Sequence, residues 1–390
     1  MLAISVLLAA PMPARPEPTN APWYKESPFY QNETALPSLR SERRPAEGVA
    51  AIVLSFNHRA NIAAIAAALV REAPGISEIV IAEDGSTDGS KEEWPKHLRA
   101  SSDRVAHTPD VHEIRAYNNA ARTVRNASVL CFLQDDDIPD DRGWADEVLE
   151  LFEHFRGERL GIVSGLAAEV CQIELGEQQV EHPKAMKNPK VTHRIPYVLD
   201  TAAKTSIPFM FATEAWLSPL CARRDVFEEL GGFDERLTKP GEPGIGLDIH
   251  LSLRAARRGY TVGLHGAEFH RGVGGHGTVS DPAKTALRLK KRQDISTEIR
   301  TIAGCRWPPA MLARAAALNK QHLRIRDDAV VDEIDAKCLA FTSRPCGGHH
   351  HSGASSLPAA PSAASGSSRS RSRPPPGTAS SEGSGARRPR

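Results

Sequence analysis

The 390-residue chain is poor in aromatic residues and nearly neutral, and these two shortages exclude one broad class of function. Phe, Trp and Tyr together make up 5% of the sequence, and the formal net charge is +1. Proteins that bind single-stranded nucleic acid stack bases on aromatic side chains, and nucleic-acid-binding domains in general carry a strongly basic face. We therefore expect no nucleic-acid partner.

Long apolar runs are also missing. The N-terminal run Leu2–Ala10 is too short to span a bilayer, and no later segment holds 18 consecutive apolar residues, so no internal membrane span is expected. Leu2–Ala10 resembles the apolar core of a signal peptide, although no Lys or Arg precedes it, and a truncated start is an alternative. Asn32-Glu33-Thr34 and Asn126-Ala127-Ser128 are glycosylation sequons. We favour the secretory pathway or Golgi lumen over the cytoplasm.

The six cysteines are scattered and include no CxxC pair, so a zinc site is not expected. Cys131 lies in a predicted buried strand, where a free thiol is ordinary. Cys338 and Cys346 could close a short disulfide loop in an oxidising compartment.

Composition divides the chain into four predicted regions. Residues 1–47 are an apolar segment followed by a linker, and residues 48–280 are an α/β domain with halves at 48–145 and 146–280. Residues 281–346 are a C-terminal helical extension. The tail at 347–390 is rich in Ser, Pro and Arg and has few large apolar residues, so we expect it to be disordered.

Strand and helix patterns alternate through the first half of the α/β domain. Short apolar runs predict strands, and longer amphipathic or Ala-rich runs predict helices. The strands are 49–54, 78–82 and 129–133; the helices are 62–71, one starting near Ser90, 113–125 and 144–155. This order predicts βαβ units and a mostly parallel sheet.

Three of the predicted strands end in polar residues. These ends are Ser55-Phe56-Asn57, Glu83 to Ser86, and Asp135-Asp136-Asp137. Ligands of open parallel sheets bind beyond the carboxyl ends of the strands, so these groups converge on one crevice if the strands are neighbours. A turn with a helix cap is the alternative interpretation of Glu83–Ser90.

The three consecutive aspartates indicate a cation. Carboxylates this close raise each other's pKa unless a cation lies among them. Mg²⁺ and Mn²⁺ prefer such oxygen ligands and share their remaining positions with substrate phosphates. A solvated acidic loop is the alternative.

The second half of the domain holds another group of polar residues. The residues 223–235 predict a helix that Gly231 and Gly232 end, and 244–260 predict a helix with Asp248 in its first turn. Ile249, Leu253 and Ala256 should face the core. A strand from Tyr260 to His270 precedes the glycine-rich loop 271–277, which could close over a bound ligand. Asp248 could instead serve only the helix N-terminus, and His270 could be structural.

In order and spacing, these segments resemble the family 2 glycosyltransferases from about Val49 to Thr278. The matching segments are IVLSFNHR, EIVIAEDGSTDGS, FLQDDDIPDD, LCARRDVFEELGGFDE and GLDIHLSLRAARRGY, followed by the strand ending at His270. The resemblance implies a GT-A fold, which is a Rossmann-like, mostly parallel central sheet with flanking helices. It also implies a nucleotide-sugar donor, Mn²⁺ or Mg²⁺, and inverting transfer of one sugar to an acceptor hydroxyl.

The resemblance also implies a role for each matching polar residue. Ser55 and Asn57 border the nucleotide, and Asp84 holds its base or ribose. In the DxD motif, Asp135 contacts the ribose or metal, Asp136 belongs to the nucleotide-sugar site, and Asp137 ligates the metal. Asp248 matches the general base, and His270 matches a position that helps to hold the metal in some members.

The chain departs from the family pattern at two positions beside Asp248. Leu247 replaces a common Glu, which should lower the pKa of Asp248 slightly, and His250 replaces a carboxylate. The polar stretch 168–204 fits no family motif and shapes the acceptor side or is an insertion.

The resulting hypothesis is a nucleotide-sugar-dependent glycosyltransferase, with a UDP-sugar as the first choice of donor. Its acceptor is a glycan, a protein or a small molecule. Two alternatives stay open: a sugar-phosphate nucleotidyltransferase, and a non-catalytic relative that binds sugars or a partner. The first should carry a glycine-rich loop after the first strand, and SFNHRAN is not glycine-rich.

Overall fold

A computed structural model of the chain describes nine stretches of residues, which are 48–72, 75–139, 143–165, 167–170, 173–176, 195–217, 219–239, 241–272 and 309–342. All of them belong to one compact unit that ends at Arg344. The predicted boundaries at 47 and 280 and the tail from 347 stay predictions. Among the described residues, no helix has the length and apolar character needed to cross a membrane.

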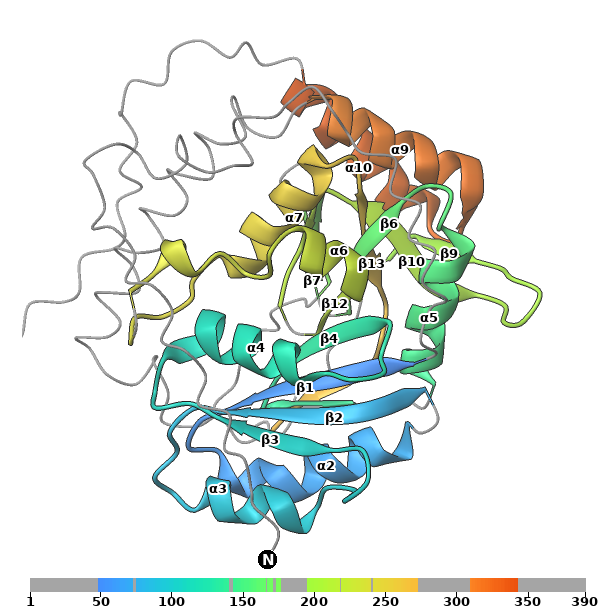
Figure 1. Cartoon of the computed structure of the whole chain (residues 1–390). Coiled ribbons are helices and arrows are strands. Elements are labelled where there is room, and N and C mark those ends of the chain that lie inside the picture. The colour runs from blue at the N-terminus through green and yellow to red at the C-terminus, as the bar shows by residue number, and fades with distance from the viewer. Residues whose placement is uncertain are drawn as a thin grey trace, which may run out of the picture. The chain divides into compact units, whose positions relative to one another are not determined.

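The centre of the molecule is a ten-stranded sheet in the order β15-β9-β10-β13-β6-β12-β4-β1-β2-β3 (Figure 1). Its strands are β1 (Val49–Ser55), β2 (Ile76–Glu83), β3 (Arg104–His107), β4 (Val129–Gln134), β6 (Leu160–Ser164), β9 (Tyr197–Leu199), β10 (Ile207–Ala212), β12 (Leu220–Arg223), β13 (Thr261–His265) and β15 (Arg324–Ile325). Strand β1 runs parallel to both β2 and β4, and β2 runs parallel to β3. The predicted parallel arrangement of the first half is confirmed.

The second half of the sheet is mixed. Strand β12 is antiparallel to both β4 and β6, β13 is parallel to β6, and β10 is antiparallel to β13. Two small sheets lie beside it. One contains β7 (Ala167–Val170), β8 (Ile173–Gly176) and β11 (Glu214–Ala215), and the other pairs β5 (Asp137–Pro139) with β14 (Phe269–Arg271).

The inner strands β1, β4 and β6 are mostly apolar and buried, because both faces of the central sheet are covered by helices. They are α2 (Ile62–Arg71), α3 (Ser90–Glu93), α4 (His112–Thr123), α5 (Trp144–His154), α6 (Arg224–Glu229), α7 (Leu247–Arg257), α9 (Pro309–His322) and α10 (Asp328–Thr342), with short 3₁₀ turns at Arg59–Asn61, Trp94–Lys96 and Glu235–Leu237. In β1, Ala51 and Val53 join the apolar cluster of α2 and α5, whereas Ala50 and Ile52 join that of α4 and α7. Successive strand residues thus point to opposite, equally buried faces.

The predicted helix near Ser90 is confirmed: α3 begins at that residue, lasts four residues and is followed by a 3₁₀ turn with Pro95 at its second position. One prediction of element shape was wrong. The predicted strand from Tyr260 to His270 splits into β13 and β14, because Gly266 N–H donates to the Pro208 carbonyl and the chain then leaves the central sheet. His270 consequently lies inside β14.

Helix α7 begins and ends inside the predicted range 244–260, and Asp248 is in its first turn as expected. Its predicted apolar face was wrong in part: Leu253 is buried as expected, but Ile249 and Ala256 keep partial exposure. The buried row is Leu247, Leu251 and Ala255, spaced four residues apart. Polar residues of α7 are buried beside this row, so the apolar pattern gave the wrong rotation of the helix.

Cys131 is not a free thiol, contrary to the prediction. It forms a disulfide with Cys221, its register partner across β4 and β12, with 4.0 Å between the Cα atoms. Cys338 is also disulfide-bonded, and Cys346 lies outside the described residues. The Cys131–Cys221 bond joins β4, which leads to the three aspartates, with β12. The residue Leu217, just before β12, contacts Asp248.

Loss of this disulfide should destabilise the protein. The bond spans 90 residues, and closing so long a loop stabilises a fold by roughly 2–5 kcal/mol. In urea titrations, the free energy of unfolding of the Cys131→Ala/Cys221→Ala variant should be lower than that of the wild type by an amount in this range. The single variants Cys131→Ala and Cys221→Ala are the controls. Alkylation of both thiols in denatured, unreduced wild type would contradict the bond.

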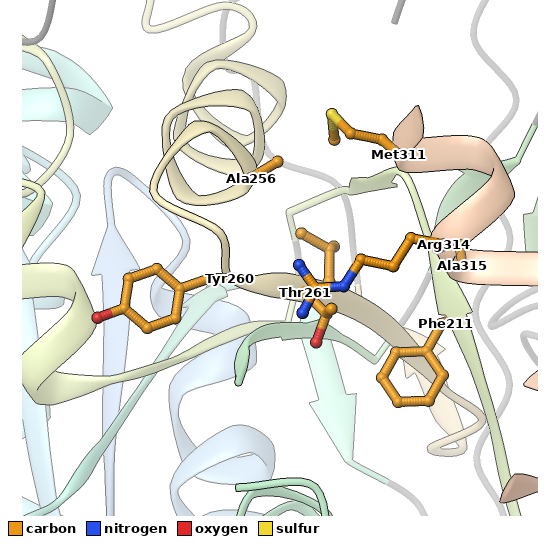
Figure 2. A pocket seen from close by; sticks show the side chains of 9 residues that line it. Phe211, Ala256, Tyr260, Thr261, Met311, Arg314 and Ala315 are labelled. Atoms are coloured by element: carbon orange, nitrogen blue, oxygen red, sulfur yellow. The ribbon is translucent and has the colours of Figure 1, made fainter. Parts of the chain in front are cut away.

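A small cavity lies at the start of β13, between α7, β13 and α9. Its volume is about 40 Å³, and Figure 2 shows Arg314 of α9 extending toward Thr261 at the start of β13. A cavity of this size holds a few water molecules at most. It is too small for a nucleotide sugar, and it lies at the opposite end of β13 from the polar strand ends.

Candidate functional site

The polar strand ends predicted to converge do meet at one edge of the sheet. Strand β1 lies between β2 and β4, with Ser55 opposite Glu83 and Leu54 opposite Gln134. The three following loops therefore start side by side. Ligands of parallel sheets bind beyond strand ends arranged in this way.

Asp135 is held by the loop that follows β1. Phe56 N–H donates to Asp135 Oδ2 at 2.9 Å, His58 Nδ1 contacts Oδ1, and Asn61 Nδ2 donates to the Asp135 carbonyl at 3.1 Å. Burial raises the pKa of Asp135, the contact with His58 opposes this, and Asp136 adds a smaller increase. Burial therefore outweighs the repulsion between carboxylates that the sequence emphasised.

Ser55 and Asn57 shape the same loop. Ser55 is fully buried, and its Oγ accepts a hydrogen bond of 2.8 Å from Trp94 Nε1. Asn57 has a φ of 58°. Its Oδ1 accepts from Thr87 N–H at 2.8 Å, and its own N–H donates to Ser86 Oγ at 3.1 Å. Asn57 thus ties the loop after β1 to the loop after β2, while Ser55 packs beneath both.

Asp84 organises the start of α4. Its buried carboxylate accepts from Thr108 Oγ1, Val111 N–H and His112 N–H, each at 2.7 Å. The alternative interpretation of this segment as a turn with a cap is partly correct. Asp88 accepts a hydrogen bond of 2.9 Å from the N–H of Ser90, the first residue of α3. Asp84 accepts one from the N–H of His112, the first residue of α4. In this structure the Asp84 carboxylate is engaged by protein groups.

Asp137 and His270 come from two strands that pair with each other. Asp137 begins β5 with its side chain 1% exposed, and its register partner in β14 is Arg271. His270 pairs with Ile138, and Asp136 O accepts from Gly272 N–H at 2.6 Å. The structure brings the His270 backbone next to the aspartates, as the resemblance requires. The His270 side chain and the loop after Gly272 lie outside the described parts.

The described residues contain no ready-made group of three or more His, Cys, Asp or Glu side chains that would hold a metal. Asp135 is bound by His58, and Asp136 and the buried Asp137 follow it directly in the sequence. Mg²⁺ is often held by one or two carboxylates plus substrate phosphates. This donor set therefore fits a cation that binds together with a diphosphate.

A contact between a buried histidine and a glutamate stabilises the β5–β14 ribbon. His265 at the end of β13 is fully buried, and its Nε2 lies 2.5 Å from Glu147 Oε2 of α5. Lys204 forms an ion pair with the other Glu147 oxygen. Helix α5 follows β5 and β13 precedes β14, so this pair fixes the segments on either side of the ribbon.

Asp248 lies at the same edge, held by a separate element. Its Oδ2 accepts from Leu217 N–H at 2.8 Å and its Oδ1 from Ile249 N–H at 2.9 Å. Leu217 is just before β12, whose residue Leu220 pairs with Phe132 near the end of β4. Desolvation raises the pKa of Asp248, and the two N–H donors oppose it. Burial thus outweighs the slight decrease expected from Leu247.

His250 replaces the family carboxylate without adding charge. It is 2% exposed, and burial followed by the nearby Arg254 lowers its pKa to about 3. Asp234 faces the same cluster; burial opposes its ionisation, yet Arg236 at 2.6 Å keeps its pKa at about 2. Arg254 Nη1 donates to Gly232 O at 2.9 Å. His250 is therefore neutral at neutral pH in a cluster that attaches α7 to the 232–236 loop.

Sequence reasoning missed His58, Glu147, His265 and Lys204. His58 stands inside the matched segment IVLSFNHR, so its position directly after the first strand was the available signal. Glu147 and His265 are 118 residues apart, and only the fold brings them together.

Comparison with known proteins supports the family resemblance. The sequence profile described as glycosyl transferase family 2 matches residues 50–188. The O-antigen biosynthesis protein RfbC of Myxococcus xanthus is 28% identical over 179 residues, which are 44% of this chain and 12% of that protein. The chain thus spans only a small part of this curated relative.

Solved structures with a similar arrangement include TarS 1–349 of S. aureus, at 14% identity and a TM-score of 0.39 over 75% of this chain and 71% of that one. The mannosyltransferase PcManGT of Pyrobaculum calidifontis, in complex with GDP-Man and Mn²⁺, has 15% identity and a TM-score of 0.40 over 77% and 83%. Scores this low add no argument of their own. The profile match and the mostly parallel sheet agree with the GT-A fold that the sequence predicted. Residues 50–188 therefore match glycosyl transferase family 2, the family that the sequence resembles.

Proposed function

We propose that the chain transfers a sugar from a nucleotide-sugar donor to an acceptor hydroxyl, with inversion at the anomeric carbon. The observation that carries this proposal is the meeting of two acidic groups, Asp135–Asp137 and Asp248, at one edge of a sheet in a chain of this family. The groups are held by different elements, so each can serve a different side of the reaction.

The aspartates after β4 belong to the donor side. Asp137 would ligate Mg²⁺ or Mn²⁺, Asp135 and Asp136 would contact the nucleotide sugar, and the loops after β1 and β2 would border the nucleoside. When bound, the cation neutralises charge that develops on the leaving diphosphate. We favour a UDP-sugar as donor.

Asp248 belongs to the acceptor side. Its raised pKa brings it closer to the range in which a general base works best. It would accept the proton of the acceptor hydroxyl while that oxygen attacks the anomeric carbon. Because attack comes from the face opposite the leaving diphosphate, one carboxylate cluster cannot serve both sides. Two separate acidic groups meet this requirement.

The reaction products test this proposal. We expect the full chain, given Mn²⁺, a panel of nucleotide sugars and a mixture of glycan acceptors, to release a nucleoside diphosphate. Release of pyrophosphate from a sugar phosphate and a nucleoside triphosphate would support the nucleotidyltransferase instead. Binding of a nucleotide without any product would support the non-catalytic relative.

We also propose that the protein folds in an oxidising compartment of the secretory pathway. The Cys131–Cys221 disulfide supports this, because disulfides persist in such compartments and are rare in the cytosol. Asn126 of the second sequon is exposed just before β4, at the edge of the sheet opposite the site. A glycan there would leave the site open.

A further inference from the structure

The segment Phe56–Asn61 forms a cradle around one residue of the DxD motif. A backbone N–H, an imidazole and a side-chain amide of this segment all contact Asp135. Phe56 and His58 engage different oxygens of the same carboxylate, and Asn61 holds its main chain. The orientation of the Asp135 carboxylate is therefore set by the loop after β1, 77 residues away in sequence at His58.

The hydrogen bonding of the His58 side chain involves one nitrogen and one carboxylate. Its Nδ1 contacts Asp135 Oδ1, while Nε2 is buried and has no hydrogen-bond partner in the part of the chain that the structure describes. The two side chains are 14% and 9% exposed. An imidazole this enclosed, bound through one nitrogen to one carboxylate, has little freedom to serve another contact.

We infer that His58 is a positioning residue of the donor site, which orients the Asp135 carboxylate for the nucleotide sugar. This inference rests on the proposed function. Without the imidazole, Asp135 Oδ1 would lose the contact that fixes its position. His58 and Phe56 N–H fix both oxygens before the ligand binds, which reduces the cost of ordering them during binding.

Substitution of His58 by asparagine or by glutamine tests which of its two ring nitrogens matters. Asparagine places its amide nitrogen near the position of Nδ1, whereas the longer glutamine places its amide near Nε2. We expect His58→Asn to preserve the contact with Asp135 and His58→Gln to lose it. His97→Gln is the control for the His-to-Gln change itself, because His97 contacts Glu93 through Nε2 at 3.2 Å, outside the site, and glutamine should keep that contact.

The measurement is calorimetric titration of the folded variants with UDP, GDP, CDP and dTDP in the presence of Mn²⁺. For the nucleotide that the wild type binds, His58→Gln should weaken affinity by about 10-fold or more, in the range for residues that orient a ligating group. His58→Asn and His97→Gln should stay within about 3-fold of the wild type. Thermal unfolding of each variant confirms that the fold is retained.

The outcomes distinguish this inference from the proposed function. No binding by the wild type would overturn the proposed function and the inference with it. Binding by the wild type with equal affinity in His58→Gln would overturn the inference alone. Equal losses in His58→Gln and His58→Asn, with both variants folded, would also overturn it, because the contact through Nδ1 would then not be the cause.

Discussion

Asp137→Ala is expected to abolish metal-dependent transfer, with a loss of at least about 10²-fold. The wild-type carboxylate is buried at the start of β5, and in the proposed function it ligates the cation. Nucleoside diphosphate release at saturating Mn²⁺ measures the effect.

Thermal unfolding without ligand checks that the Asp137→Ala variant is folded before its activity is compared with that of the wild type. Asp332→Ala, at an exposed position on α10, is the control and should keep full activity. Normal turnover by Asp137→Ala would contradict its assignment to the metal.

Asp248→Asn should separate chemistry from binding. Asparagine keeps a side-chain oxygen that can accept the Leu217 or Ile249 N–H, so α7 should stay in place. It cannot accept a proton from the acceptor, which should lower kcat by roughly 10²- to 10⁴-fold. The dissociation constant of the donor nucleotide, measured by calorimetry, should change little. A normal kcat would remove Asp248 from the role of base.

The same residue predicts the pH dependence of the wild type. A base works when ionised, so the rate should fall as the pH decreases through the pKa of Asp248. Burial raises that pKa above its ordinary value, which is about 3.9 for a free aspartate. The acid limb of kcat/KM should therefore lie above pH about 4 and should be absent from the residual activity of Asp248→Asn. An identical acid limb in both proteins would indicate that another group titrates.

The sequence was sufficient for the parallel half of the fold and its polar edge. The apolar runs at β1, β2 and β4 are buried on both faces, and short runs of this kind predict parallel strands. Because carboxyl ends of neighbouring parallel strands share an edge, the positions of Asn57 and Asp135 followed from strand order. Asp248 followed from its place in the first turn of a helix within a family motif.

Features that depend on distant residues could not be predicted. The contact of His58 with Asp135 and the disulfide of Cys131 with Cys221 each join residues at least 77 positions apart. A lone histidine or cysteine has no periodic pattern that reveals its partner. The rotation of α7 was wrong for a related reason: His250 and Arg254 are buried by the loop at 232–236, which an apolar pattern cannot anticipate.

Nucleotide binding tests the central claim most directly. The measurement is thermal unfolding of the full chain with UDP, GDP, CDP or dTDP, each with and without Mn²⁺, beside Asp137→Ala. We predict stabilisation by one nucleotide that requires Mn²⁺ and is lost in the variant; at ~100 times the dissociation constant it should be roughly 2.7 kcal/mol. No stabilisation by any of the four would contradict the donor site and leave Asp135–Asp137 as an acidic loop.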